Sequence, residues 1–166
     1  TITARDPGGR SDTQSLVVNV NDVNSYTPVI TSNGGSTKTL SLPENYSTGS
    51  SIYTVKATDA DGDNISYSLS NNTDFRIDSS GNVYFKKTPD YESDTSLSTT
   101  IYAKDPGNKT DSQVLKVNLS DVNDNTPQIT SNGGSTKTLS LPENYSTGSS
   151  VYRVTATDAD LSLIHI

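Results

Sequence analysis

The chain has 166 residues, a net charge of −7 and only 30% apolar residues. The negative charge argues against binding to nucleic acid or to an anionic membrane surface. The absence of cysteine excludes a disulfide framework and thiolate chemistry. The apolar content is low for one large core and adequate for small β-sandwiches with narrow cores.

Residues 1–4 have the pattern of the middle of a strand, so we expect the sequence to be an excerpt of a longer protein. A short extended segment is predicted at 29–31, before the turn-forming residues 32–35. Period-two alternation and turn signals then predict strands at 37–42, 51–58, 64–69, 75–77, 83–85, 97–103 and 114–119. About seven short strands without a helical period indicate an all-β fold, an antiparallel sandwich of two sheets.

Residues 28–61 recur with four substitutions at 127–160, 99 residues later. The opening residues 2–8 match 101–107 at the same offset. We therefore expect the end of one repeat at 1–27, a complete repeat at 28–126 and the beginning of a third at 127–160. A unit near 100 residues has the size of one β-sandwich, and near-identical neighbours predict a long tandem array.

Acidic residues gather at the ends of the expected strands. These acids are Glu44, Asp59, Asp61, Asp90, Glu92 and Asp105. The connector 121–127 adds two carboxylates and two amides before a proline, which favours extended backbone. Stacked sandwiches would bring these groups together. At about 5 Å and an effective dielectric constant near 20, each pair of like charges costs roughly 3 kcal/mol, so we expect a cation there, and calcium prefers oxygen ligands.

Five motifs make the chain resemble a cadherin repeat array. They are Leu42-Pro43-Glu44-Asn45, Asp59-Ala60-Asp61, Pro89-Asp90-Tyr91-Glu92, Ala103-Lys104-Asp105 and Asp121-Val122-Asn123-Asp124-Asn125-Thr126-Pro127. The resemblance implies tandem seven-stranded Greek-key β-sandwiches of immunoglobulin-like architecture, joined end to end with calcium ions at each junction.

At the junction between 28–126 and 127–160, here called the second junction, the resemblance implies a full calcium site. The implied ligands are Glu44, Asp90, Glu92, the carbonyl of Val122, Asn123, Asp124, Asn125, Asp158 and Asp160.

The first junction, between 1–27 and 28–126, departs from this pattern in its connector, residues 22–28. Ser25 stands where Asp124 stands in the second connector, and Tyr26 stands where Asn125 stands. Losing a carboxylate should weaken or remove at least one ion, so we expect the first junction to be the looser one. The resemblance leaves it a reduced calcium site of Asn24, Asp59, Asp61, Asn64 (carbonyl) and Asp105.

The resemblance also implies a function. We expect an extracellular adhesion protein, secreted or at a cell surface as in large bacterial adhesins, whose junctions calcium stiffens. Its partners would be neighbouring repeats and another adhesin, bound homophilically, or a cell-surface molecule, with no membrane contact within this stretch. Two alternatives stay open: a calcium-independent immunoglobulin-like spacer, and a carbohydrate-binding accessory module of a secreted enzyme. The latter needs an aromatic platform, for which Tyr46, Tyr53 and Tyr152 are the candidates.

We expect no enzymatic activity, because His165 is the only histidine and the acids have the pattern of strand-end ligands. The tail 161–166 is expected to be non-native. The repeat predicts a Gly-Asp-Asn-like loop after Asp160, and an apolar hexapeptide stands there instead.

Overall fold

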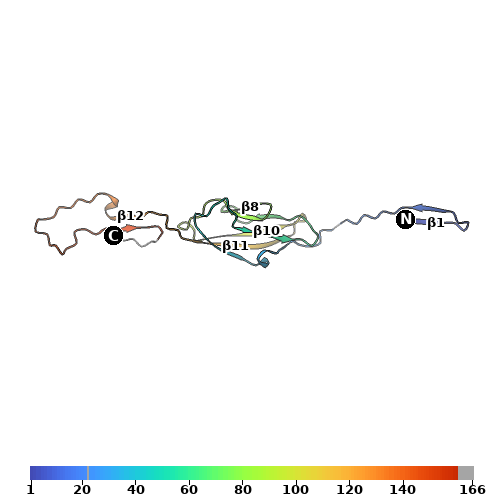
Figure 1. Cartoon of the computed structure of the whole chain (residues 1–166), viewed down its shortest axis with the longest axis horizontal. Helices are drawn as coiled ribbons and strands as arrows, with labels where there is room; N and C mark the ends of the chain where they lie inside the picture. The colour runs from blue at the N-terminus through green and yellow to red at the C-terminus, as the bar shows by residue number, and fades with distance from the viewer. Residues whose placement is uncertain (22, 161–166) are drawn as a thin grey trace.

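The computed structural model describes residues 1–21 and 23–160. The expectation of a non-native tail at 161–166 therefore falls outside the described residues, as does Asp22 of the first connector. The described chain is extended, with one thick unit in the middle and a thinner segment on each side (Figure 1). No helix in the described residues is long and apolar enough to cross a membrane.

The middle unit is all-β, as predicted. Its elements are β3 (Val29–Ile30), the short 3-10 turn η1 (Ser32–Gly35), β4 (Lys38–Pro43), β5 (Tyr53–Thr54), β6 (Ala57–Thr58), β7 (Ser66–Leu69), β8 (Phe75–Ile77), β9 (Asn82–Phe85), β10 (Ser96–Lys104) and β11 (Thr110–Ser120). One sheet has the order β4-β11-β10-β7, a second has the order β5-β9-β8, and β3 pairs with β6. If β3 with β4 and β5 with β6 are each counted as one interrupted strand, the unit has the seven strands that the sequence predicted.

The expected all-antiparallel pairing is wrong at one edge. Strand β4 runs parallel to β11, with Pro43 opposite Ser120. The reason is that the chain enters the unit at one pole through β3, leaves that pairing at η1 and then joins the other sheet at its free edge. The two strands therefore end at the same pole, where the connector to the next segment begins.

The expected strand 51–58 is divided in two. Strand β5 pairs with β9, and β6 pairs with β3. Between them, the amide of Val55 donates to the carbonyl of Gly81 at 2.9 Å. Gly81 has φ +82°, and a Cβ there would collide with the Val55 carbonyl. This close approach bends the chain from one partner strand to the other.

The core lies between the sheets and follows the predicted alternation. Every second residue of β11 is buried from Gln113 to Leu119. Phe75 and Phe85 stack at the centre, with ring centroids 5.4 Å apart. The fully or nearly buried apolar residues are Ile30, Val55, Phe75, Val83, Phe85, Ile101, Ala103, Leu115, Val117 and Leu119.

A buried glutamine was not predicted from the sequence. Gln113 is 1% exposed, and its amide nitrogen donates to the carbonyls of Ser32 and Ser36 at 2.8 and 2.7 Å. Its Oε1 accepts the hydroxyl of Tyr53 at 3.0 Å. Gln113 therefore holds the η1 turn against the sheet, and these hydrogen bonds satisfy the buried amide of its own side chain.

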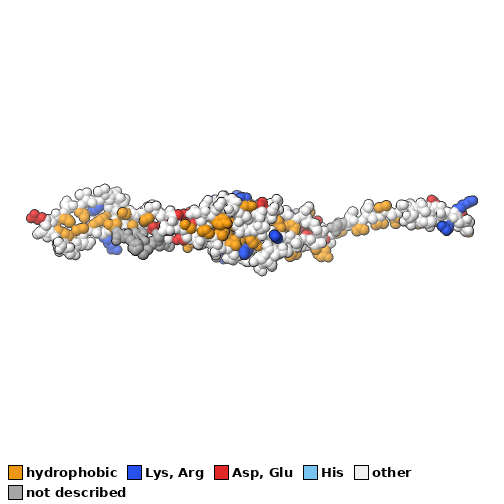
Figure 2. All heavy atoms as spheres, in the orientation of Figure 1, with side chains coloured by type: hydrophobic (Ala, Val, Ile, Leu, Met, Phe, Trp, Pro, Cys, Tyr) orange, Lys and Arg blue, Asp and Glu red, His pale blue; other side chains and the backbone are white. Residues whose placement is uncertain are grey.

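The flanking segments contain few strands. The N-terminal one has the hairpin β1 (Ile2–Arg5) and β2 (Ser11–Gln14), and the C-terminal one has β12 (Gln128–Ile129), the turn η2 (Ser131–Gly134) and β13 (Ala156–Thr157). Residues 137–142 repeat the sequence of β4 but form no strand, and no described strand pairs with them. Their apolar side chains, like those of 16–20, are exposed (Figure 2). The proposed repeat boundaries at 27 and 126 stay a prediction.

Candidate metal centres at the two junctions

The parallel pairing of β4 and β11 brings Glu44 to the second connector. Glu44 directly follows β4, and its amide donates to the carbonyl of Ser120 at 3.1 Å. The next amide, of Asn45, donates to the carbonyl of Pro89 at 3.0 Å, which holds the loop between β9 and β10 against the same pole. Three segments that are distant in sequence therefore meet at this pole, where acidic side chains lie at the narrow second junction (Figure 2).

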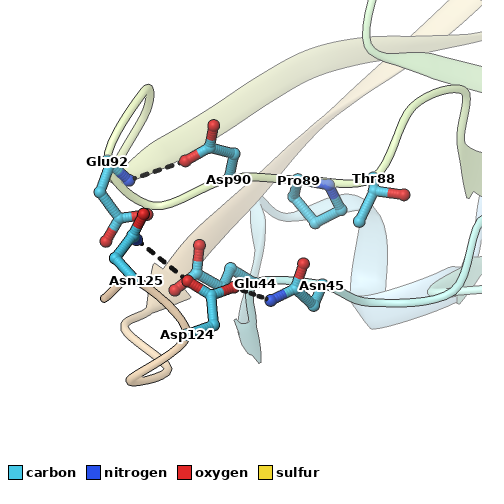
Figure 3. Close-up of a pocket in the computed structure, with 8 residues that line it drawn as sticks. All are labelled: Glu44, Asn45, Thr88, Pro89, Asp90, Glu92, Asp124 and Asn125. Atoms are coloured by element: carbon cyan, nitrogen blue, oxygen red, sulfur yellow. Dashed lines mark hydrogen bonds between the residues drawn. The ribbon is translucent and has the colours of Figure 1, made fainter. Parts of the chain in front are cut away.

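Glu44 is the most buried acid of this group, with 3% of its surface exposed. Its Oε1 accepts the amide of Val122 at 2.8 Å, and its Oε2 accepts the amide of Tyr91 at 2.7 Å. One carboxylate thus joins the connector to the β9–β10 loop. The side chain of Asn45 adds a hydrogen bond to Asp124 (Figure 3).

Asp160 contributes from the far side of the connector. It is 5% exposed, and its carboxylate accepts the backbone amide of Asn125 at 2.7 Å and the Asn125 side-chain amide at 2.6 Å. Its own amide donates to Asp158 at 3.0 Å. The short Asp-Ala-Asp turn after β13 is therefore docked on the connector.

Two groups of three carboxylates form at this junction. The first contains Glu44, Glu92 and Asp121, and the second contains Glu92, Asp124 and Asp160. In each group, one oxygen per residue lies within 4.8 Å of the others. Glu92 belongs to both groups, and its side chain points toward Asn125 and the connector (Figure 3). The arrangement offers oxygen ligands from both sides of the connector.

Crowding of negative charge affects the protonation of these acids. Loss of hydration at the pole, together with the charges of Glu44 and Asp160, raises the pKa of Glu92 to about 7. The pKa of Asp121 is also raised, by loss of hydration and then by the charge of Asp160. Loss of hydration would raise the pKa of Asp160, but the hydrogen bonds from Asn125 lower it overall. Within the described residues the one salt bridge, Lys87 to Asp74, neutralises none of them.

Not all of the predicted ligands join these groups. Asp90 lies beside Glu92, and its carboxylate accepts Ser93 Oγ at 2.9 Å; this hydrogen bond lowers its pKa. Asp90 and Asp158 are outside both three-carboxylate groups in the described chain. Val122 is held by its amide, and the structure gives the side chain of Asn123 no partner among the described residues.

The opposite pole of the middle unit faces the first connector. There Asp59, Asp61 and Asp63 place one carboxylate oxygen each within 4.8 Å of the others. Asp61 accepts the amides of Ser25 and Tyr26 at 2.8 and 2.7 Å, as Asp160 accepts Asn125 at the second junction. The first connector is therefore docked through the same type of contact, without a carboxylate at position 25.

Three side-chain oxygens at this pole are buried and accept no hydrogen bond from the residues that the structure describes. They are Asn24 Oδ1, Asp59 Oδ2 and Asp105 Oδ2, and Asp105 as a whole is only 3% exposed. Buried oxygens without donors are costly. A hard cation that takes oxygen ligands fits them well. All three residues belong to the reduced site predicted from the sequence, whereas Asn64, also predicted for this site, is exposed.

Two acids of these groups were absent from the predicted ligands. Asp121 opens the connector motif, and Asp63 belongs to the acidic loop after β6. Both lie within two residues of predicted ligands, so acid density alone could have included them. Of the aromatic candidates, Tyr46 and Tyr53 pack against the core instead of forming an exposed platform.

Comparison with known proteins agrees with this geometry. The chain matches the model of the cadherin domain family over residues 38–120, half of its length. The mouse protein named "Cadherin EGF LAG seven-pass G-type receptor 2" is 36% identical over 169 residues, which cover 98% of this chain and 6% of that protein. The human receptor 1 of the same name is 37% identical over 166 residues, covering 96% of this chain and 5% of that protein. The crystal structure of human CDH23 EC21-23 matches with a TM-score of 0.69 and 28% identity, over 85% of this chain and 46% of that one.

Proposed function

This chain belongs to the cadherin family, and we propose that it binds calcium at both junctions and stiffens there. The observation that carries the proposal is the presence of two clusters of three carboxylates at the second junction. The clusters share Glu92, and their oxygens come from the middle unit, the connector and the following segment. At the distances found, such charges repel one another unless a cation lies among them. The three unpartnered oxygens at the first junction support a cation there as well.

At the second junction Glu44, Glu92, Asp121, Asp124 and Asp160 would hold calcium, joined by Asp90, Val122, Asn123, Asn125 and Asp158 as the sequence predicts. Calcium supplies the positive charge that lets these oxygens stay together. The chain's own contribution is positional: Glu44 holds the connector to the β9–β10 loop, and Asp160 holds it to the next segment. The role is mechanical rather than catalytic.

The first junction would bind fewer ions. Ser25 offers no carboxylate, and its hydroxyl donates to the carbonyl of Val23 at 3.0 Å. Asn24, Asp59, Asp61 and Asp105, with the carbonyl of Asn64, would make a reduced site, extended by Asp63. We infer that the first junction is the looser of the two.

In the whole protein, such units would form part of an extracellular array that adheres to another cell or surface. The relatives named above are receptors with cadherin in their names, and this chain spans 5–6% of their length. The partner would be a second adhesin, bound homophilically, or another cell-surface molecule.

Isothermal titration calorimetry, with calcium titrated into the chain, tests the proposal. We expect a tight class of sites that Asp124→Ala removes, and a weaker class that Asp105→Ala removes. A chain that gives the same heat signal as buffer alone would refute calcium binding. Equal affinities for the two classes would refute the ranking of the junctions.

A further inference from the structure

Asn24 of the first connector is held by the middle unit at three points. Its side-chain amide donates to Asp63 Oδ2 at 2.9 Å. Its backbone carbonyl accepts the ammonium group of Lys109 at 3.0 Å. Its side chain also lies against Gly107, where an added Cβ would come within 2.6 Å of the Asn24 amide nitrogen. Asn24 therefore makes two charge-assisted hydrogen bonds and one close packing contact with the middle unit.

The contact with Asp63 fixes which way the Asn24 amide faces. Because the nitrogen is bound to Asp63, the oxygen Oδ1 is turned away from it, and this oxygen is buried with no hydrogen-bond donor among residues 1–21 and 23–160. The other unpartnered oxygens of this pole belong to Asp59 and Asp105. By binding the nitrogen, Asp63 turns the neutral oxygen of the Asn24 amide toward these carboxylates. If the Asn24 amide were rotated, it would present N–H groups there instead, and these would repel a cation.

The backbone of Lys109 is held in place by a hydrogen bond of its own. It directly follows the β10–β11 turn, where its amide donates to Asp105 Oδ1 at 2.8 Å. The preceding repeat has the same arrangement 99 residues earlier, with the amide of Arg10 donating to Asp6 at 2.8 Å. A basic side chain thus follows this turn in both repeats, and in the middle unit it reaches the connector.

We propose that Asp63 and Lys109 are positioning residues that dock the first connector on the middle unit without a metal ion. Lys109 supplies a fixed positive charge at the junction that lacks the carboxylate of Asp124. The carbonyl that it binds is not among the predicted calcium ligands, so ion and lysine can act together. The orientation of Oδ1 matters only if the proposed calcium function holds, whereas the docking of the connector does not depend on it.

The test is NMR relaxation of the full chain in EDTA, read at the backbone amides of 23–26. We expect order parameters near 0.85, the value of rigid backbone. Asp63→Ala and Lys109→Met should each lower them toward about 0.6, the range of flexible segments. Gly107→Ala should do the same without removing a polar group, because it displaces the Asn24 side chain.

Two controls separate positioning from folding. Lys109→Arg should retain the order of the connector, as arginine stands at this place in the preceding repeat. Lys116→Met, on the exposed face of β11, should change nothing at 23–26, and the order parameters of β10 and β11 should be the same in all variants. A connector already flexible in the unsubstituted chain, or one still rigid in both Asp63→Ala and Lys109→Met, would overturn the proposal. Because no calcium is present, failure of calcium binding would not affect this result.

Discussion

Removing the carboxylate of Glu44 should loosen the second junction even when no calcium is present. In Glu44→Ala the amides of Val122 and Tyr91 lose their acceptor, at 2.8 and 2.7 Å in the structure. An unsatisfied buried donor costs about 1–3 kcal/mol. Since Val122 is 38% exposed and water can reach it in part, we expect a total loss of about 2–4 kcal/mol, or roughly 10–20 °C in Tm for a unit of this size.

Glu44→Gln separates the hydrogen bonds from the charge. Its amide oxygen can still accept one of the two donors, so in EDTA we expect a loss of only about 1 kcal/mol. In calcium the same variant should lose most of the stabilisation that the ion provides, because a charged ligand has gone. Thermal unfolding in EDTA and in calcium measures both quantities.

The matched control is Glu143→Gln. Glu143 occupies the position of Glu44 in the next repeat, 99 residues later, and is exposed. It should leave Tm unchanged in both conditions. If Glu44→Ala unfolds within about 2 °C of the unsubstituted chain in EDTA, or if Glu44→Gln keeps the full gain from calcium, the role assigned to Glu44 is wrong.

Three further predictions concern other residues. Ser25→Asp should raise calcium affinity at the first junction, measured by calorimetry, because it supplies the carboxylate found at position 124; unchanged affinity would show that the weakness arises elsewhere. Glu92 has a pKa raised to about 7, so its contribution to stability in EDTA is present below pH 4.5, the ordinary value, and is lost as the pH rises through 7. Calcium must displace that proton, so affinity at the second junction should be higher at pH 8 than at pH 5.5, and Glu92→Gln should flatten this dependence. Gln113→Leu leaves two turn carbonyls without their donor and should cost about 2–4 kcal/mol in urea unfolding, whereas Gln14→Leu, its exposed counterpart, should cost much less.

The sequence predicted the strands well because their side chains alternate strictly. Strand β11 shows this most clearly, with buried residues at every second position from 113 to 119. The acids that follow the predicted strands gather in groups at the two poles of the middle unit. Local pattern was sufficient here, since each strand has one face toward a narrow core.

The parallel pairing of β4 with β11 could not be predicted from pattern. Alternation determines which face of a strand is buried, but it carries no information about the direction of the neighbouring strand. This pairing is nevertheless what places Glu44 beside Val122. Similarly, the sequence of residues 51–58 does not indicate that β5 and β6 pair with different strands. The division between them results from the close approach of Gly81 to Val55, and Gly81 lies far along the chain.

The acids of the candidate sites were easier to find than the residues that hold them. Acid density identified Glu44, Asp59 and Asp124. By contrast, the amide of Asn45, the ammonium of Lys109 and the side chain of Gln113 act through contacts between residues 60 to 85 positions apart. Such contacts depend on the tertiary structure, and a single sequence does not show them.

Small-angle scattering from three complete consecutive repeats, in calcium and in EDTA, tests the central claim most directly. If cations hold the carboxylates of adjoining units together, calcium should lengthen and narrow the particle, and EDTA should give a broader distribution of shapes with a smaller maximum dimension. Superimposable scattering curves under the two conditions would contradict the account.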